Sequence, residues 1–129
     1  MTPLFLLDAS VCLDILRQHV AATGLPPAGE CCVSSIVTAE LWTSLAKAPT
    51  TTRERKLEDF ISLFPIRDFD DAAARHYGDI RADLEKSGTS IGPLDLLIAG
   101  HARSLGASVV TRNVKEFRRV KGLKVTSWK

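Results

Sequence analysis

Short apolar runs, each followed by residues with helical periodicity, constrain the fold of this chain more than any other feature of its sequence. The runs are Leu4–Leu7, Cys31–Val33 and Ala107–Val110. Continuous apolar runs of this length are typical of strands that are buried on both faces of a parallel sheet. Because strands alternate with helices along the chain, the sequence predicts an α/β fold, with a central parallel sheet of four to five strands and helices on both faces.

Helical periodicity and turn-forming residues define the other elements. The sequence predicts helices over residues 9–18, 36–47, about 57–64, from 70 or 71 onward, 94–105 and 113–117, and further strands over 64–67 and 124–126. Residues 64–67 also fit the end of the helix that precedes them. Glycine and proline predict loops over residues 19–29, 48–52 and 87–93.

Length and composition indicate one globular domain over residues 1–129. No stretch approaches the roughly 18 uncharged apolar residues that a membrane helix needs, so we expect no membrane association. Asp8 and Asp14 interrupt the first apolar run, which argues against a secretory signal. The three cysteines form neither a disulfide framework nor a zinc pattern, and we interpret them as buried thiols in a reducing cytoplasm.

Charge is distributed unevenly along the chain. Residues 111–129 contain seven Lys or Arg and one acid, for a net charge of +6, and the rest of the chain carries −4. A basic segment beside an acidic body suits a polyanionic partner that also meets a metal site. A solvated basic face would have the same composition.

Four polar residues in apolar surroundings are predicted to share one edge of the sheet. Asp8 ends the first strand, Asn113 follows the last buried strand, and Glu40 and Asp95 lie near the starts of two helices. Helix N-termini and strand C-termini meet at the same edge of a parallel sheet, where ligands bind. We therefore predict that Asp8, Glu40, Asp95 and Asn113 form the catalytic site.

Three carboxylates at one edge repel one another unless a cation lies among them. Oxygen ligands favour Mg²⁺ or Mn²⁺, so we assign Asp8, Glu40 and Asp95 as metal-binding acids. Such ions activate water and neutralise charge on a phosphoryl group, which suits hydrolysis of a phosphodiester.

Three of the four site residues also have an ordinary structural explanation, whereas Glu40, with its apolar neighbours, does not. Asp8 could cap the first helix, Asp95 could favour a helix start, and Asn113 could serve its turn. Ser10 could hydrogen-bond Asp8 or a metal-bound water, or only cap a helix, and Thr111 could orient Asn113 or only fit its strand. The three histidines show no ligand spacing and are assigned surface or core roles: His19, His76 and His101.

Four segments in order resemble PIN-domain ribonucleases, and most closely the VapC-type toxins of bacterial toxin–antitoxin pairs. They are Leu-Leu-Asp-Ala-Ser with Asp8, Ala-Glu-Leu with Glu40, Pro-Leu-Asp-Leu-Leu-Ile-Ala with Asp95, and Thr-Arg-Asn-x-x-x-Phe with Asn113. The resemblance implies a single PIN-like domain with Mg²⁺- or Mn²⁺-dependent endoribonuclease activity. It also implies an RNA substrate such as tRNA or another structured RNA, a homodimer, and inhibition by a cognate antitoxin.

The resemblance also assigns roles to particular residues. Asp8 and Asp95 would hold the ion directly, and Glu40 and Asn113 would act directly or through water. Because Asn113 falls where the family has Asp or Asn, the number of ions stays open. Arg112, Lys115 and Arg118 are assigned to steering the RNA backbone, with Ser10 and Thr111 in supporting roles. Glu116 is interpreted as a solvated helix residue, with a substitute acid as the alternative.

Three rival interpretations remain. An aspartate-nucleophile phosphatase also has an Asp after the first strand, but it needs a second Asp two residues later, where this chain has Ser10. A phospho-receiver domain expects further acids and a lysine that the sequence does not supply. The third is a catalytically weak module with the same fold that binds RNA or a protein partner.

Overall fold

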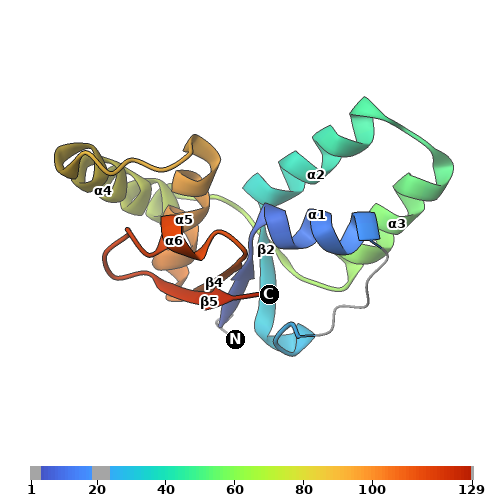
Figure 1. Cartoon of the computed structure of the whole chain (residues 1–129). Helices are drawn as coiled ribbons and strands as arrows, with labels where there is room; N and C mark the ends of the chain where they lie inside the picture. The colour runs from blue at the N-terminus through green and yellow to red at the C-terminus, as the bar shows by residue number, and fades with distance from the viewer. Residues whose placement is uncertain (1–3, 19–23, 129) are drawn as a thin grey trace.

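A five-stranded parallel sheet forms the centre of the computed structural model, which describes residues 4–18 and 24–128 (Figure 1). The strands are β1 (Phe5–Leu7), β2 (Cys31–Ser34), β3 (Ile66–Arg67), β4 (Ser108–Thr111) and β5 (Lys124–Ser127). Their order is β3-β2-β1-β4-β5, and every neighbouring pair is parallel. Leu7 pairs with Val33 on one side and with Val110 on the other, so three strands end side by side.

Helices cover both faces of the sheet, as predicted. They are α1 (Ala9–Gln18), α2 (Ser35–Lys47), α3 (Thr51–Ser62), α4 (Asp71–Ser87), α5 (Pro93–Leu105) and α6 (Val114–Phe117), and a 3₁₀ turn, η1, spans Ala28–Glu30. Figure 1 shows α1, α2 and α3 grouped on one side of the strands, and α4, α5 and α6 on the other. The reversal between the two groups follows from right-handed crossovers, because the chain passes from β3 at one edge to β4 beyond β1.

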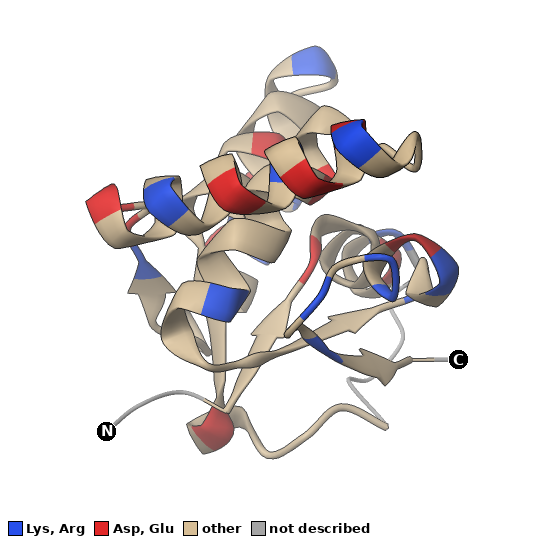
Figure 2. Ribbon diagram, turned by 90° about the vertical axis from the view of Figure 1, so that its left-hand side faces the viewer, with Lys and Arg blue, Asp and Glu red and all other residues tan. Residues whose placement is uncertain are grey.

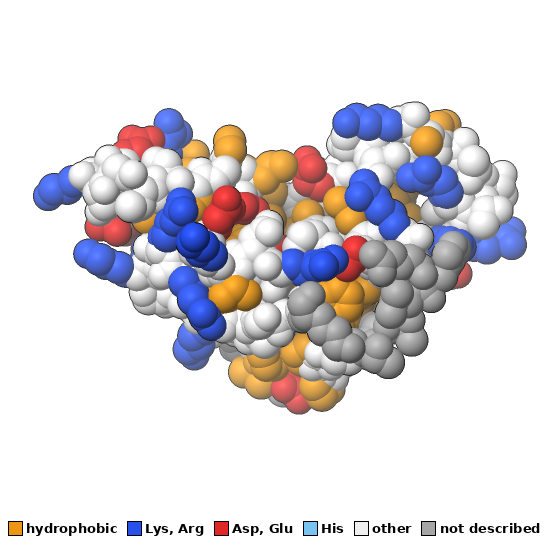
Figure 3. Space-filling model, viewed as in Figure 1, with side chains coloured by type: hydrophobic (Ala, Val, Ile, Leu, Met, Phe, Trp, Pro, Cys, Tyr) orange, Lys and Arg blue, Asp and Glu red, His pale blue; other side chains and the backbone are white. Residues whose placement is uncertain are grey.

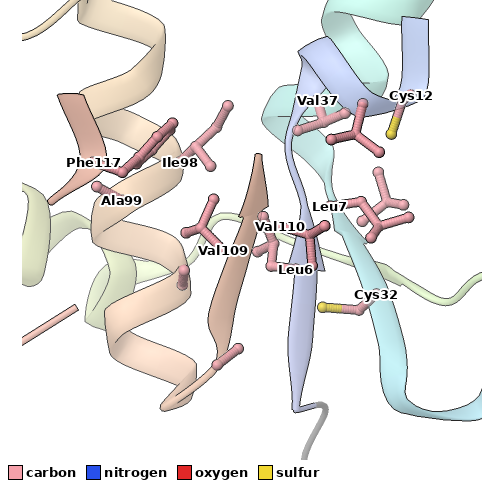
Figure 4. Close-up of a cluster of buried hydrophobic side chains, with 14 of the residues drawn as sticks. Leu6, Leu7, Cys12, Cys32, Val37, Ile98, Ala99, Val109, Val110 and Phe117 are labelled. Carbon is pink, nitrogen blue, oxygen red and sulfur yellow. The ribbon is translucent and has the colours of Figure 1, made fainter. Parts of the chain in front are cut away.

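The core lies against the central strands. Leu6, Leu7, Val109 and Val110 are almost completely buried, and they face the helices on both sides of the sheet (Figure 4). Phe117 of α6 is also fully buried. Burial on both faces explains why these strands are continuously apolar in sequence. All three cysteines are free and buried, as predicted (Cys12, Cys31 and Cys32).

The polar side of α4 faces solvent. Figure 2 shows acidic and basic residues spread along its outer surface. Two of its ion pairs join residues four apart, Arg75 with Asp71 and Arg81 with Glu85. Asp70 caps the helix, because its Oδ1 accepts the Ala73 N–H at 2.9 Å. Asp70 therefore has the capping role expected of an acid at this position.

Several element boundaries differ from the sequence predictions. The third strand is confined to Ile66–Arg67, because Phe64 belongs to the turn that ends α3 and packs against Phe60. The fourth strand includes Thr111, one residue beyond the prediction. Residues 19–23 of the predicted 19–29 loop lie outside the described residues. Among the described helices, none is both long enough and apolar enough to cross a membrane.

Candidate active site at the carboxyl edge of the sheet

Asp8 is held rigidly at the end of β1. It is 1% exposed, and its Oδ1 accepts the Ser10 hydroxyl at 2.7 Å and the Val11 N–H at 3.1 Å. The bond from Val11 makes Asp8 the N-cap of α1, so the capping explanation is correct. Its Oδ2 accepts the buried Thr111 hydroxyl at 2.5 Å. Each carboxylate oxygen has about two lone-pair sites, so Oδ1 is fully used by its two donors, whereas Oδ2 keeps capacity for a further ligand.

Thr111 connects the ends of two neighbouring strands. While its hydroxyl donates to Asp8, the same oxygen accepts the backbone N–H of Asn113 at 2.9 Å. Asn113 itself is exposed, and its side chain makes no capping bond to α6. Thr111 therefore orients both residues, and the Asn113 amide is free to turn toward a ligand at the rim.

Asp95 lies in a cluster of acids. It is in the first turn of α5 and is partly buried, and it lies close enough to Glu116 and Asp8 for both to act on its pKa. Burial raises the pKa of Asp95 to about 7, and the hydrogen bond and charge of Glu116 and the charge of Asp8 add to the effect. A carboxyl whose pKa is raised in this way is typical of functional sites.

Glu116 is not the solvated helix residue that the sequence indicates. It is partly buried on α6 and contacts Asp95. The sequence does contain a signal for this position. Glu116 follows Asn113 by three residues, and residues three apart share one face of a helix. Glu116 therefore lies on the same side of α6 as Asn113, which faces the carboxyl edge of the sheet where β4 ends.

Glu40 occupies the second turn of α2, as predicted, and is partly buried. Among the described residues, no hydrogen bond joins it to Asp8 or Asp95, and no three His, Cys, Asp or Glu side chains are arranged to hold one ion. The assignment of Asp8, Glu40 and Asp95 as metal-binding acids therefore stays a prediction. The acids that influence one another are Asp8, Asp95 and Glu116.

The donor set fits a hydrated divalent cation. Mg²⁺ binds through one or two carboxylates and keeps several waters, so a preformed cage of three protein ligands is not required. Asp8 and Asp95 supply two carboxylates close enough for the charge of one to raise the pKa of the other. A cation between them would relieve that repulsion.

The predicted cationic residues differ in their surroundings. Arg112 is paired with Asp14 of α1, with its Nη1 2.5 Å from the carboxylate, so part of its charge is already neutralised. Lys115 and Arg118 are exposed on and just after α6. Figure 3 shows Lys and Arg side chains on both sides of the acidic side chains at the middle of this face. Lys115 and Arg118 are therefore the more available candidates for a polyanion.

Replacing Glu116 by glutamine is expected to lower the pKa of Asp95. The variant removes one negative charge and can donate a hydrogen bond to the ionised Asp95 carboxylate, while burial still holds the pKa above its ordinary value. A pH titration of the Asp95 carboxyl carbon by NMR, in metal-free protein, measures the effect. Glu85→Gln, which changes an exposed acid of α4, is the matched control. An unchanged Asp95 titration in Glu116→Gln would contradict the contact.

A groove lies between α1, α2 and α3, apart from the acids. It encloses about 290 Å³. Leucine side chains from all three helices form its apolar part, and Arg17, Arg53 and Lys56 supply three cations at its wall. An apolar groove with basic sides suits an amphipathic segment that carries acidic residues.

The fold and the acidic edge together define an α/β domain with a candidate hydrolytic site, and comparison with known proteins identifies the family. The PIN domain family matches residues 5–123, so the chain belongs to that family. Its relatives include the tRNA(fMet)-specific endonuclease VapC of Shigella flexneri, 38% identical over 96% of this chain and 97% of the relative. Ribonuclease VapC2 of Haemophilus influenzae is 36% identical over 96% of this chain and 97% of its own length.

Solved structures give the same result. The structure is similar to a chain in the crystal structure of VapBC2 from Rickettsia felis bound to a promoter DNA fragment, with a TM-score of 0.86 and 33% identity over 98% of this chain and 99% of that one. It is also similar to a chain in DNA-bound VapBC from Salmonella typhimurium, with a TM-score of 0.81 and 34% identity over 98% and 99%. The predicted resemblance and fold class are confirmed.

Proposed function

We propose that this chain is a metal-dependent endoribonuclease that hydrolyses RNA phosphodiester bonds, and that it is the toxin of a type II toxin–antitoxin pair. Its full-length relatives are VapC nucleases. The observation that carries the proposal is the acidic edge, where burial, with the further effect of Glu116 and Asp8, raises the pKa of Asp95 to about 7. Carboxylates that lie close together despite their mutual repulsion are typical of sites that bind a divalent cation and act on phosphate groups.

Asp8 and Asp95 would hold Mg²⁺ or Mn²⁺, with Glu40, Glu116 and Asn113 around its water shell. When bound, the ion supplies charge neutralisation at the scissile phosphate and lowers the pKa of an attacking water. The protein's part is to fix the ligands. Ser10 and Thr111 hold the Asp8 carboxylate in one orientation, so little reorganisation is needed when substrate arrives.

RNA would approach over α6. Lys115 and Arg118 are exposed beside the acids and can contact backbone phosphates, and a tRNA or another structured RNA is the substrate class we propose. Single Lys115→Ala and Arg118→Ala variants are each expected to weaken RNA binding and to reduce the slope of log K against log salt by about 0.7. Filter binding over a salt series measures this. Lys86→Ala, at the exposed end of α4, is the control and should leave the slope unchanged.

The partner would be an antitoxin protein that inhibits the nuclease. The groove between α1, α2 and α3, with its leucines and its Arg17, Arg53 and Lys56, suits an acidic amphipathic segment of that partner. We further propose that the chain acts in the cytoplasm and forms a homodimer. Sedimentation of the purified chain would test the dimer directly.

The deciding experiment is cleavage of a panel of structured RNAs by the purified chain, with Mg²⁺, with Mn²⁺ and with EDTA. Cleavage that requires the ion and is lost in Asp8→Asn supports the proposal. Cleavage that survives both chelation and the substitution would overturn it. The toxin assignment is tested separately, by expressing the chain with and without the protein encoded beside it and measuring growth.

One alternative function has an observation in its favour. The exposed Lys115 and Arg118 can contact a polyanion without any part for the acids, so a module that binds RNA without cleaving it is the second candidate. Tight RNA binding that is unaffected by Mg²⁺ or EDTA, with no turnover, would favour it. The phosphatase interpretation is weakened, because position 10 holds a serine whose hydroxyl is bonded to Asp8.

A further inference from the structure

A serine and a histidine form a buried polar pair behind the acidic edge. Ser34 is 0% exposed and His101 is 1% exposed, and the Ser34 Oγ lies 2.8 Å from His101 Nδ1. The proposed chemistry uses neither residue. Burying an imidazole costs free energy unless its nitrogen atoms are hydrogen-bonded. The bond between Ser34 and His101 therefore fixes the relative position of the two residues, in addition to filling space in the core.

The cap bond of Ser34 leaves its hydroxyl proton available to the imidazole. Ser34 is the N-cap of α2, and its Oγ accepts the Ile36 N–H at 3.0 Å. The hydroxyl proton can then be donated to His101 Nδ1, which corresponds to the neutral tautomer with the ring proton on Nε2. Burial lowers the pKa of His101, which keeps the ring neutral.

The pair joins two helices that carry acids of the site. Ser34 follows Val33, the partner of Leu7, so it is the next residue across the ladder from Asp8. α2 begins at Ser35 and carries Glu40 in its second turn, while His101 lies two turns after Asp95 on α5. The two helices lie on opposite sides of the sheet (Figure 1). The hydrogen bond between Ser34 and His101 therefore links the start of α2 to α5.

The connection from β3 to α4 completes this junction. The Phe69 N–H donates to the Ser35 hydroxyl at 3.1 Å, and the Phe69 ring meets the His101 ring edge to face, with centroids 5.6 Å apart. Neighbouring contacts thus hold His101 in one orientation. The start of α2 cannot rotate without breaking the cap bond, the histidine bond or the Phe69 bond.

We propose that His101 is a positioning residue of the nuclease. Its hydrogen bond to Ser34 fixes the start of α2 against α5, and so sets the separation of Glu40 from Asp95 and Asp8. This inference rests on the proposed function, because its consequence is a change in turnover. The separation of α2 and α5 also depends on the hydrogen bond at His101 Nδ1. That separation can be measured without any cleavage activity.

Two substitutions separate positioning from packing. His101→Asn places an amide oxygen near the position of Nδ1 and can still accept from Ser34, whereas His101→Gln places its amide near Nε2 and cannot. We expect His101→Gln to lower kcat about tenfold with KM for RNA little changed, and His101→Asn to stay within about threefold of the wild type. Thermal unfolding of each variant shows whether the fold is retained.

The structural readout is a distance between spin labels on Thr43→Cys of α2 and Asp79→Cys of α4, which packs on α5. Both positions are exposed, whereas the native cysteines are buried and remain unlabelled. We expect a narrow distance distribution in the wild type and in His101→Asn, and a shifted or broadened one in His101→Gln. Equal distances and equal kcat in both variants would overturn the proposal, and so would losses that follow only the melting temperature. If the wild type cleaves no RNA, the proposed function fails, while the distances still decide the positioning role.

Discussion

Replacing Asp8 by alanine is expected to abolish RNA cleavage and to destabilise the protein at the same time. The carboxylate accepts hydrogen bonds from Ser10, Val11 and Thr111, and Asp8 and Thr111 are almost fully buried. Without it, three donors lose their acceptor, which costs about 3 kcal/mol of folding free energy. Loss of a ligand to the proposed ion should lower kcat by about 10³-fold or more.

Asp8→Asn separates the two effects. An asparagine retains one oxygen for capping α1 but lacks the charge, so we expect a smaller loss of stability with the same loss of cleavage. Urea unfolding and single-turnover RNA cleavage measure the two quantities. Thr50→Ala, which removes the exposed cap of α3, is the control, and it should cost about 1 kcal/mol and leave cleavage intact. Wild-type cleavage by Asp8→Asn would exclude Asp8 from the mechanism.

Asp95→Asn is expected to abolish cleavage while stabilising the metal-free protein above neutral pH. The wild-type carboxyl has its pKa raised from 3.8 to about 7, chiefly by burial and by Glu116. Ionising it in the folded state is therefore unfavourable. The full shift corresponds to about 4 kcal/mol, but Asp95 is only partly buried and solvent screens its charge, so about 1 kcal/mol is the expected gain.

The pH dependence of the wild type has a definite sign. Between pH 4 and pH 7 the folded protein retains the Asp95 proton, while the unfolded chain has released it. The stability contributed by the protonated carboxyl is complete below pH 4 and is lost as the pH rises to about 7. Asp95→Asn lacks this loss, so the difference in stability between the two proteins should grow over this interval and stay constant above it.

Urea unfolding in EDTA at several pH values between 4 and 8 measures that difference. Asp79→Asn, on the exposed face of α4, is the control and should follow the wild type. Added Mg²⁺ should stabilise the wild type above pH 7 and leave Asp95→Asn almost unchanged, because the variant has lost a ligand. If the free energies of unfolding of wild type and Asp95→Asn change with pH in parallel, the pKa of the Asp95 carboxyl is not raised in the folded protein.

The contact between Asp95 and Glu116 shows where sequence reasoning reached its limit at the site. Asp8 could be located because it ends an apolar strand, and parallel topology puts strand ends at one edge. Asp95 could be located because Gly-Pro precedes it at a helix start. Whether Glu116 points to solvent or to Asp95 depends on how α6 is rotated against the sheet. That rotation is set by the burial of Phe117.

The same limit applies to the basic and buried polar residues. The sequence shows that Arg112 follows a strand, but its pairing with Asp14 requires α1 and β4 to be neighbours in space. The sequence shows a histidine among apolar residues of α5, but Ser34 is 67 positions away from it. The sequence places Glu40 in the second turn of a helix, but its distance from the other acids depends on how α2 packs against the sheet.

By itself, the sequence determined the alternation of strands and helices, the parallel sheet and the edge at which the polar residues collect. These features follow from periodicity and chain direction, which are local properties. Only the tertiary structure decided which acids interact, which cations are already paired and which buried polar groups join the helices. Those outcomes depend on the rotation and separation of packed elements, and every side chain in the core contributes to both.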